Sequence, residues 1–171
     1  MVERSLRSDD EMGQPREPIP AFLPEWMASE VDLSDLEGIF PSEQRQLLKE
    51  GRAARGAMVA ALDRVGAGVL AGSDCPGCRL VPGRSLLREI ELMVEAGLSP
   101  WRALCTATVN AAKFIGETNG GLVAPGARAD LVVIDSDPLD DISALRRQSG
   151  VVVNGRWLPK RKIEEIILSA G

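Results

Sequence analysis

An unbroken apolar run at residues 67–72, with the sequence AGVLAG, limits what this chain can fold into more than any other feature. A strand with one face in water alternates apolar and polar residues. This run does not alternate, so we expect a strand buried on both faces, as in a parallel sheet. Because helical patterns precede and follow it, the sequence predicts an α/β fold. Asp74 follows the run, where α/β enzymes keep functional groups; the alternative is a loop aspartate that caps a turn before Pro76.

Three helices are predicted around this strand from the spacing of apolar residues and from the residues at the helix ends. Ser99 is expected to cap the third helix, because it precedes Pro100, which suits the first helical position. A glycine is expected to end each helix. The predicted helices cover residues 42–65, 85–96 and 100–115, and their glycines are Gly66, Gly97 and Gly116.

After the third helix the apolar spacing changes from helical to that of short strands. Asn154-Gly155 is the strongest turn signal in the chain and predicts a hairpin. Residues 142–147 are expected to form one or two helical turns, and residues 163–168 a short amphipathic segment. The strand candidates are residues 122–123, 131–134 and 151–153.

The 171 residues contain no histidine, so they cannot by themselves complete any mechanism that needs an imidazole base or ligand. The hydrophobic fraction of 44% is that of an ordinary globular protein and excludes collagen-like, disordered and disulfide-scaffold classes. A net charge of −5 argues against nucleic acid as a partner. No apolar run approaches the roughly 20 residues of a membrane span, so no membrane association is expected. Three cysteines without an export signal indicate a reducing cytoplasm.

Six segments between residues 55 and 158 resemble the metal-dependent amidohydrolase superfamily, in the family's order and spacing. Residues 68–74 (GVLAGSD) are similar to its last barrel strand, which ends in Gly-Thr-Asp or Gly-Ser-Asp. Residues 107–112 (ATVNAA) match its AT-x-N-A-A stretch, and residues 124–135 (APGARADLVVID) its PGxxADLVxxD segment. The imidazolonepropionase-like branch is the most similar in character. The other matching segments are residues 82–90, 95–104 and 151–156, the last resembling a closing hairpin.

The resemblance implies a (β/α)8 TIM-type barrel with a companion β-sandwich, and one or two divalent metals, often zinc, held largely by histidines. It further implies that Asp74 contacts the metal, takes a proton from the bound water and hands it to the leaving amine. The implied activity is hydrolysis of non-peptide C–N bonds in a small-molecule amide, cyclic amide or amidine. A barrel alone takes about 250 residues, and Asp74 is the only matched ligand. We therefore interpret the chain as the C-terminal part of the barrel plus sandwich strands, incomplete.

Four parts are expected along the chain. Residues 1–41 form an acidic, proline-rich lead segment. Residues 42–117 hold the last barrel strand and its flanking helices, residues 118–159 the sandwich strands, and residues 160–171 a C-terminal tail.

Two alternatives to an active hydrolase stay open. One is a non-catalytic fragment or subunit, inactive alone, which self-associates or binds a complementary chain that supplies the missing histidines. We favour this alternative for the chain's own activity. The other is a redox pair or zinc site at Cys75 and Cys78, whose CPGC sequence is otherwise a variable loop; a closed zinc site would also need Asp74 or Cys105.

Several other residues are interpreted as architectural rather than catalytic. A helix-face asparagine and two aspartates at the ends of a strand are expected to bond backbone or turns, and two tryptophans are expected in the core or at a domain contact. Two arginines near the predicted barrel mouth meet either an anionic substrate or, as we favour, water. The asparagine is Asn110, the aspartates are Asp130 and Asp135, the tryptophans are Trp101 and Trp157, and the arginines are Arg79 and Arg84.

Overall fold

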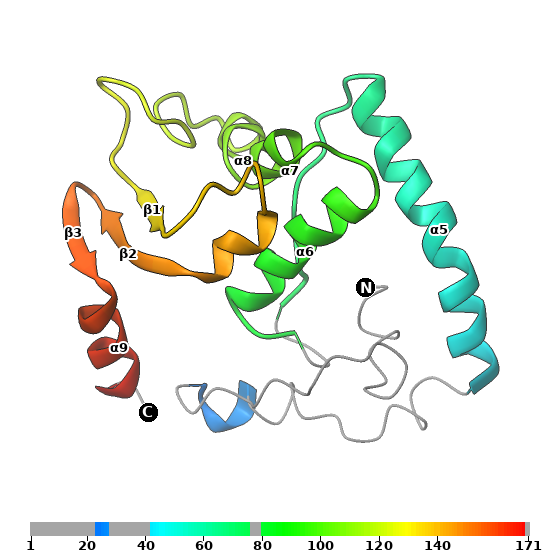
Figure 1. Cartoon of the computed structure of the whole chain (residues 1–171), viewed down its shortest axis with the longest axis horizontal. Coiled ribbons are helices and arrows are strands. Elements are labelled where there is room, and N and C mark those ends of the chain that lie inside the picture. The colour runs from blue at the N-terminus through cyan, green and yellow to red at the C-terminus, as the bar shows by residue number, and fades with distance from the viewer. Residues whose placement is uncertain (1–22, 28–41, 76–79, 170–171) are drawn as a thin grey trace.

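The structure is a computed structural model of the whole chain, and it describes residues 23–27, 42–75 and 80–169. Figure 1 shows α5 at one side of the molecule, the shorter helices in the middle and a small sheet with α9 at the other side. None of the helices in the described ranges is long and apolar enough to cross a membrane. The elements are α5 (Ser42–Arg64), α6 (Arg84–Glu95), α7 (Pro100–Ala107), α8 (Val109–Phe114), β1 (Leu131–Ile134), the 3-10 helix η1 (Ile142–Arg146), β2 (Gln148–Val153), β3 (Arg156–Pro159) and α9 (Lys160–Ser169).

The helices end where the glycines predict. At the end of α5, the N–H of Gly66 donates to the carbonyl of Asp63 and the N–H of Ala67 to that of Leu62, at 3.0 Å each. This pair of bonds satisfies two carbonyls of the last turn and needs a residue with positive φ between them, which Gly66 supplies at 76°. The same arrangement closes α6 and α8 at the other two predicted glycines. Ser99 Oγ caps α7 as predicted, accepting a hydrogen bond from the backbone N–H of Arg102.

The prediction of one helix over residues 100–115 is wrong, because the chain breaks helical geometry at Thr108, where φ is −125° and ψ is −96°. The Thr108 hydroxyl donates to the carbonyl of Leu104 at 2.8 Å. Such a bond from a threonine to the preceding turn competes with the helical hydrogen bonds and bends helices. Two short helices, α7 and α8, therefore replace the predicted long one.

The predicted strand at residues 67–72 is also not formed: residues 67–75 have no regular secondary structure. A strand exists only when a neighbouring strand bonds its backbone, and here the bonds go to helices instead. The N–H of Ala71 donates to the carbonyl of Thr106 at 3.2 Å, and Asn110 Nδ2 donates to the carbonyl of Val69 at 3.0 Å. Residues 122–123, another strand candidate, likewise lie outside regular secondary structure.

The sheet is antiparallel, with strand order β1-β2-β3. The bounds of β1 are those predicted, and β2 starts three residues earlier than predicted. The predicted turn joins β2 to β3, with φ at 49° in Asn154 and 78° in Gly155, which is the left-handed pair that such two-residue hairpins need. Across this hairpin, Val152 is the partner of Trp157. The predicted helical segments at 142–147 and 163–168 correspond to η1 and to part of α9.

A small core lies between α6, α7 and the segment before Asp74. Its fully buried members are Ile90, Met93, Leu98 and Ala103. Buried Thr106 is satisfied inside it, because its hydroxyl bonds the carbonyl of Ala103 at 2.6 Å and the sulfur of Met93 at 3.3 Å. The partly buried residues around it are Val59, Ala60, Val69, Ala71, Leu86, Val94, Ala107, Ile142 and Leu145.

The two tryptophans predicted for the core or for a domain contact do not lie in the core of the described residues, and the domain contact stays a prediction. Trp101 is 63% exposed at the start of α7, and Trp157 is about half exposed on β3. The Trp157 ring packs across the hairpin over Gly150, where an added Cβ would lie 2.4 Å from the ring. The small core explains the difference, because the described elements offer no layer that could cover either side chain.

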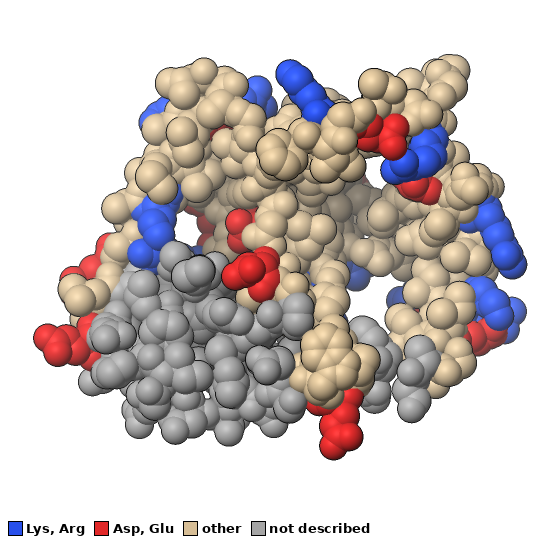
Figure 2. Space-filling view, turned by 180° about the vertical axis from the view of Figure 1, so that it is seen from behind, with Lys and Arg blue, Asp and Glu red and all other residues tan. Residues whose placement is uncertain are grey.

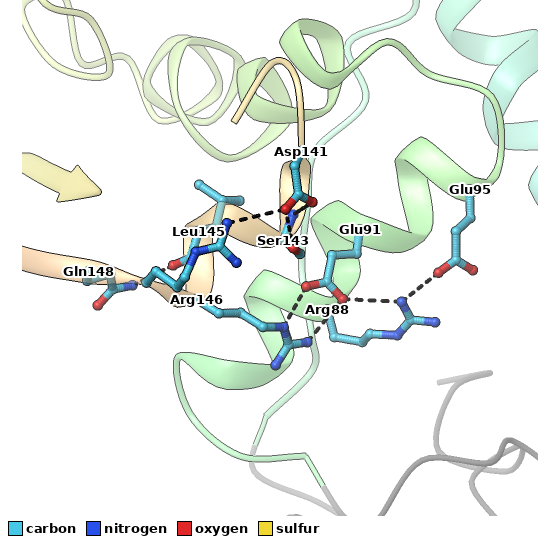
Figure 3. Close-up of polar contacts among 9 residues, drawn as sticks. Arg88, Glu91, Glu95, Asp141, Ser143, Leu145, Arg146 and Gln148 are labelled. Atoms are coloured by element: carbon cyan, nitrogen blue, oxygen red, sulfur yellow. Dashed lines mark hydrogen bonds and ion pairs between the residues drawn. The ribbon is translucent and has the colours of Figure 1, made fainter. Parts of the chain in front are cut away.

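A row of ion pairs runs along α6 and joins this helix to η1, which leads into the sheet (Figure 3). Glu91 on α6 binds Arg146 on η1 through both carboxylate oxygens, at 2.6 and 3.0 Å, and also Arg88 at 3.2 Å. Arg88 extends the row to Glu95 at 2.6 Å, and Glu95 binds Arg52 on α5 at 2.8 Å. Burial by itself would raise the pKa of Glu91, but the hydrogen bonds and charges of Arg146 and Arg88 outweigh it and lower that pKa below its ordinary value of 4.5.

Candidate functional site

Asp74 lies at the end of the segment that the helices hold, and its side chain is exposed. Its backbone has a φ of 54°, in the left-handed region. Few residues other than glycine adopt this conformation, although aspartate and asparagine tolerate it better than most. Asp74 therefore lies in an irregular segment of the chain, at a left-handed position and in contact with solvent.

The α7–α8 junction fixes the chain three to five residues before Asp74. The side chain of Asn110 donates a hydrogen bond to the carbonyl of Val69, and the carbonyl of Thr106 accepts one from the N–H of Ala71. The interpretation that Asn110 meets backbone from a helix face is thus confirmed. The backbone that Asn110 binds belongs to the segment that leads to Asp74.

Cys75 closes the loop on the other side of Asp74. Its thiol donates to the carbonyl of Leu80 at 3.1 Å, and Leu80 is buried. Burial raises the pKa of the Cys75 thiol, which keeps it protonated and opposes its use as a nucleophile or a metal ligand. Cys78 and Arg79 lie outside the described residues, so the redox or zinc alternative stays a prediction.

The polar residues of the sheet are architectural, as predicted. Asp130 accepts the N–H of Asn154 at 2.6 Å and Arg128 Nε at 2.6 Å. The Asn154 N–H and the Arg128 guanidinium lower the pKa of Asp130, so its ionised carboxylate holds the hairpin turn. At the other end of β1, the hydroxyl of Ser149 donates to Asp135. Arg84 is exposed at the start of α6.

Sequence reasoning missed the pair of Glu91 and Arg146. The sequence does show Arg88, Glu91 and Glu95 at spacings that place them along one helix face. It does not show that Arg146, distant in the chain, reaches Glu91, because that contact depends on how η1 packs against α6.

These residues do not by themselves fit the metal centre that the resemblance implies. Within the described ranges, no group of three or more His, Cys, Asp and Glu side chains could hold a metal ion. The whole sequence, moreover, has no histidine. Asp74 is thus one candidate ligand without the set that tetrahedral or octahedral coordination requires.

Comparisons with known proteins agree on one family. The sequence model described as "Amidohydrolase family" matches residues 41–158, a range that includes Asp74. An adenine deaminase 2 of Desulfotalea psychrophila is 30% identical over 104 residues, which are 57% of this chain and 17% of that protein. An adenine deaminase of Ligilactobacillus salivarius is 35% identical over 68 residues, 40% of this chain and 12% of that protein.

The fold is similar to that of a bottromycin amidohydrolase of known structure, with a TM-score of 0.74 and 25% sequence identity. The similarity covers 99% of this chain and 39% of that chain. In each comparison, this chain spans well under half the length of its relative.

Proposed function

Because this chain belongs to the amidohydrolase family, we propose that it provides the last segment of a barrel that hydrolyses C–N bonds in a small molecule, with Asp74 as its catalytic carboxylate. The observation that carries the proposal is the position of Asp74. It is exposed, lies within the matched range and follows, after Ser73, an apolar segment whose backbone α7 and α8 bond. The likeness to the bottromycin amidohydrolase agrees with the predicted fold class, an incomplete α/β barrel part with a small sheet.

In this proposal Asp74 moves a proton. An ionised carboxylate in contact with solvent can accept a proton from an attacking water and return it to a leaving amine. The names of the two adenine deaminases favour an amidine among the three predicted bond types. The imidazolonepropionase-like branch stays a prediction.

Histidine ligands must come from outside these 171 residues. We propose that a complementary polypeptide segment brings them, and that zinc or another divalent metal binds only in the resulting assembly. The chain by itself is then inactive. We also propose a cytoplasmic location, which the free thiols of Cys75 and Cys105 support. The boundaries of the four predicted parts stay predictions, and most of residues 1–41 lie outside the described structure.

Exposed apolar surface supports a complementary chain or self-association. Leu47, Met58 and Leu62 are exposed, and their spacing places them on one face of α5; Val65, just past the end of this helix, is also exposed. In the order β1-β2-β3, two of the strands are edge strands, and edge strands invite pairing with another chain. Figure 2 shows charged side chains spaced apart on the back of the molecule, with other residues forming most of the described surface there. The other large exposed apolar residues include Trp101, Phe114, Ile115, Val132, Val133 and Val153.

Turnover assays test the proposal directly. The purified chain, supplied with zinc, manganese or cobalt, should show no hydrolysis of adenine or of cyclic amides above background. Co-expression with the histidine-bearing barrel segment of a related amidohydrolase should give turnover that Asp74→Asn abolishes. Turnover of the assembly that survives Asp74→Asn would refute the role of Asp74.

A further inference from the structure

The break between α7 and α8 lies against the segment that carries Asp74. In a continuous helix, the carbonyl of Thr106 would accept the N–H of the residue four positions later. Because the helix is interrupted at Thr108, this carbonyl accepts the N–H of Ala71 instead, at 3.2 Å. The threonine that bends the helix thus makes a backbone acceptor available to a segment more than thirty residues earlier.

Asn110 supplies a matching donor from the first turn of α8. Its Nδ2 donates to the carbonyl of Val69 at 3.0 Å, in a partly buried contact. In a parallel sheet, each bonding residue of a strand contacts two groups of its neighbour: the carbonyl of one residue and the N–H of the residue two positions later. Here these two groups are the carbonyl of Val69 and the N–H of Ala71. Thr106 and Asn110 together therefore bond residues 69–71 as a neighbouring strand would.

We propose that Asn110 is a positioning residue for Asp74, acting through this pair of bonds as a substitute for a neighbouring strand. The proposal rests on the proposed function, since the position of Asp74 matters for catalysis only if Asp74 is catalytic. Asp74 is the third residue after Ala71, and it is in a left-handed conformation that its surroundings must maintain. On the far side, the bond from Cys75 to the carbonyl of buried Leu80 fixes the chain again.

Hydrogen–deuterium exchange of the full chain tests this role without requiring activity. Asn110→Asp keeps the size of the side chain and removes the donor at neutral pH, and Asn110→Ala removes the side chain beyond Cβ. Both should accelerate exchange in peptides covering residues 69–74 by about two- to tenfold, the range expected for loss of one hydrogen bond. Peptides covering β2 and β3 should be unchanged. Asn119→Ala, which alters an exposed asparagine, should change neither region.

Two results would overturn the proposal. The first is unchanged exchange of residues 69–74 in Asn110→Asp and Asn110→Ala. The second is equal acceleration in every peptide, because Asn110 would then support the whole fold rather than this segment. A chemical-shift change at the Asp74 carboxylate carbon in Asn110→Asp, absent in Asn119→Ala, is the accompanying signature. Failure of the Asp74→Asn turnover test would refute the proposed function and leave these exchange results standing, so the two failures are distinguishable.

Discussion

Glu91 on α6 and Arg146 on η1, which are 55 residues apart in sequence, form a two-point ion pair that ties α6 to the 3-10 helix leading into β2. The Glu91 side chain is mostly buried and that of Arg146 is about one-third exposed. Removing one partner leaves the other charge partly buried and without its best hydrogen bonds.

We expect Arg146→Ala to lower the free energy of unfolding by about 1–3 kcal/mol, the range for leaving a buried polar group without its hydrogen-bond partner. Arg161→Ala is the matched control. It also removes an arginine from an ion pair, but this pair is exposed on α9, so the change should stay within about 0.5 kcal/mol. Urea unfolding of both variants measures the difference, and equal effects would show that Glu91 and Arg146 do not tie the two parts together.

The stabilising effect of Glu91 should depend on pH. Because Arg146 and Arg88 lower the pKa of Glu91 below 4.5, its contribution is fully present above about pH 4.5 and is lost as the pH falls through the lowered value. The stability difference between the native chain and Glu91→Gln should therefore be constant near neutral pH and shrink at acidic pH. A difference that grows on acidification would contradict this sign.

Asp74 should tolerate asparagine better than alanine. The left-handed backbone at φ 54° costs a residue with a β-carbon roughly 1–2 kcal/mol. This cost is smaller for asparagine than for alanine, because the asparagine side chain can hydrogen-bond the local backbone. Asp74→Asn should thus leave the unfolding free energy nearly unchanged, whereas Asp74→Ala should lower it by about 1 kcal/mol. Thermal unfolding of the two variants checks this, and an equal loss in both would mean that the backbone conformation is not the cause.

Gly150 should not accept a side chain. A Cβ there would lie 2.4 Å from the Trp157 ring and 2.5 Å from the carbonyl oxygen of Leu158. The second atom is backbone and cannot move aside cheaply, so Gly150→Ala should destabilise the chain by about 1–3 kcal/mol. Gly68→Ala is the control, because a Cβ at Gly68 meets nothing within 4 Å. Similar unfolding midpoints for the two variants would count against the close packing of β2 on β3.

The isolated chain should self-associate. Sedimentation at micromolar concentration should show oligomers or aggregates, because the apolar face of α5 and the sheet edges are exposed. Met58→Glu combined with Leu62→Glu should reduce the association, whereas Ala53→Glu, on another face of α5, should reduce it less. A monodisperse monomer with a cooperative unfolding transition would refute this expectation.

Local signals in the sequence predicted local structure well. The glycines that end helices, the cap at Ser99 and the turn at Asn154-Gly155 act within a few residues, so their patterns are visible in the sequence. The family motifs likewise placed Asp74 within a matched range. The strand at residues 67–72 could not be predicted correctly in this way, because strand formation depends on a neighbour and not on the run itself. The break at Thr108 was missed because helical spacing continues through it.

The separation of 55 positions between Glu91 and Arg146 also sets an order of events during synthesis. Ribosomes add about 5–20 residues per second, so Glu91 leaves the ribosome roughly 3–11 s before Arg146 does. In that interval the charges on α6 can already pair with one another and with Arg52 on the earlier helix α5, but not yet with Arg146. We therefore expect α6 to form first, and η1 with the sheet that follows it to pack onto this helix later.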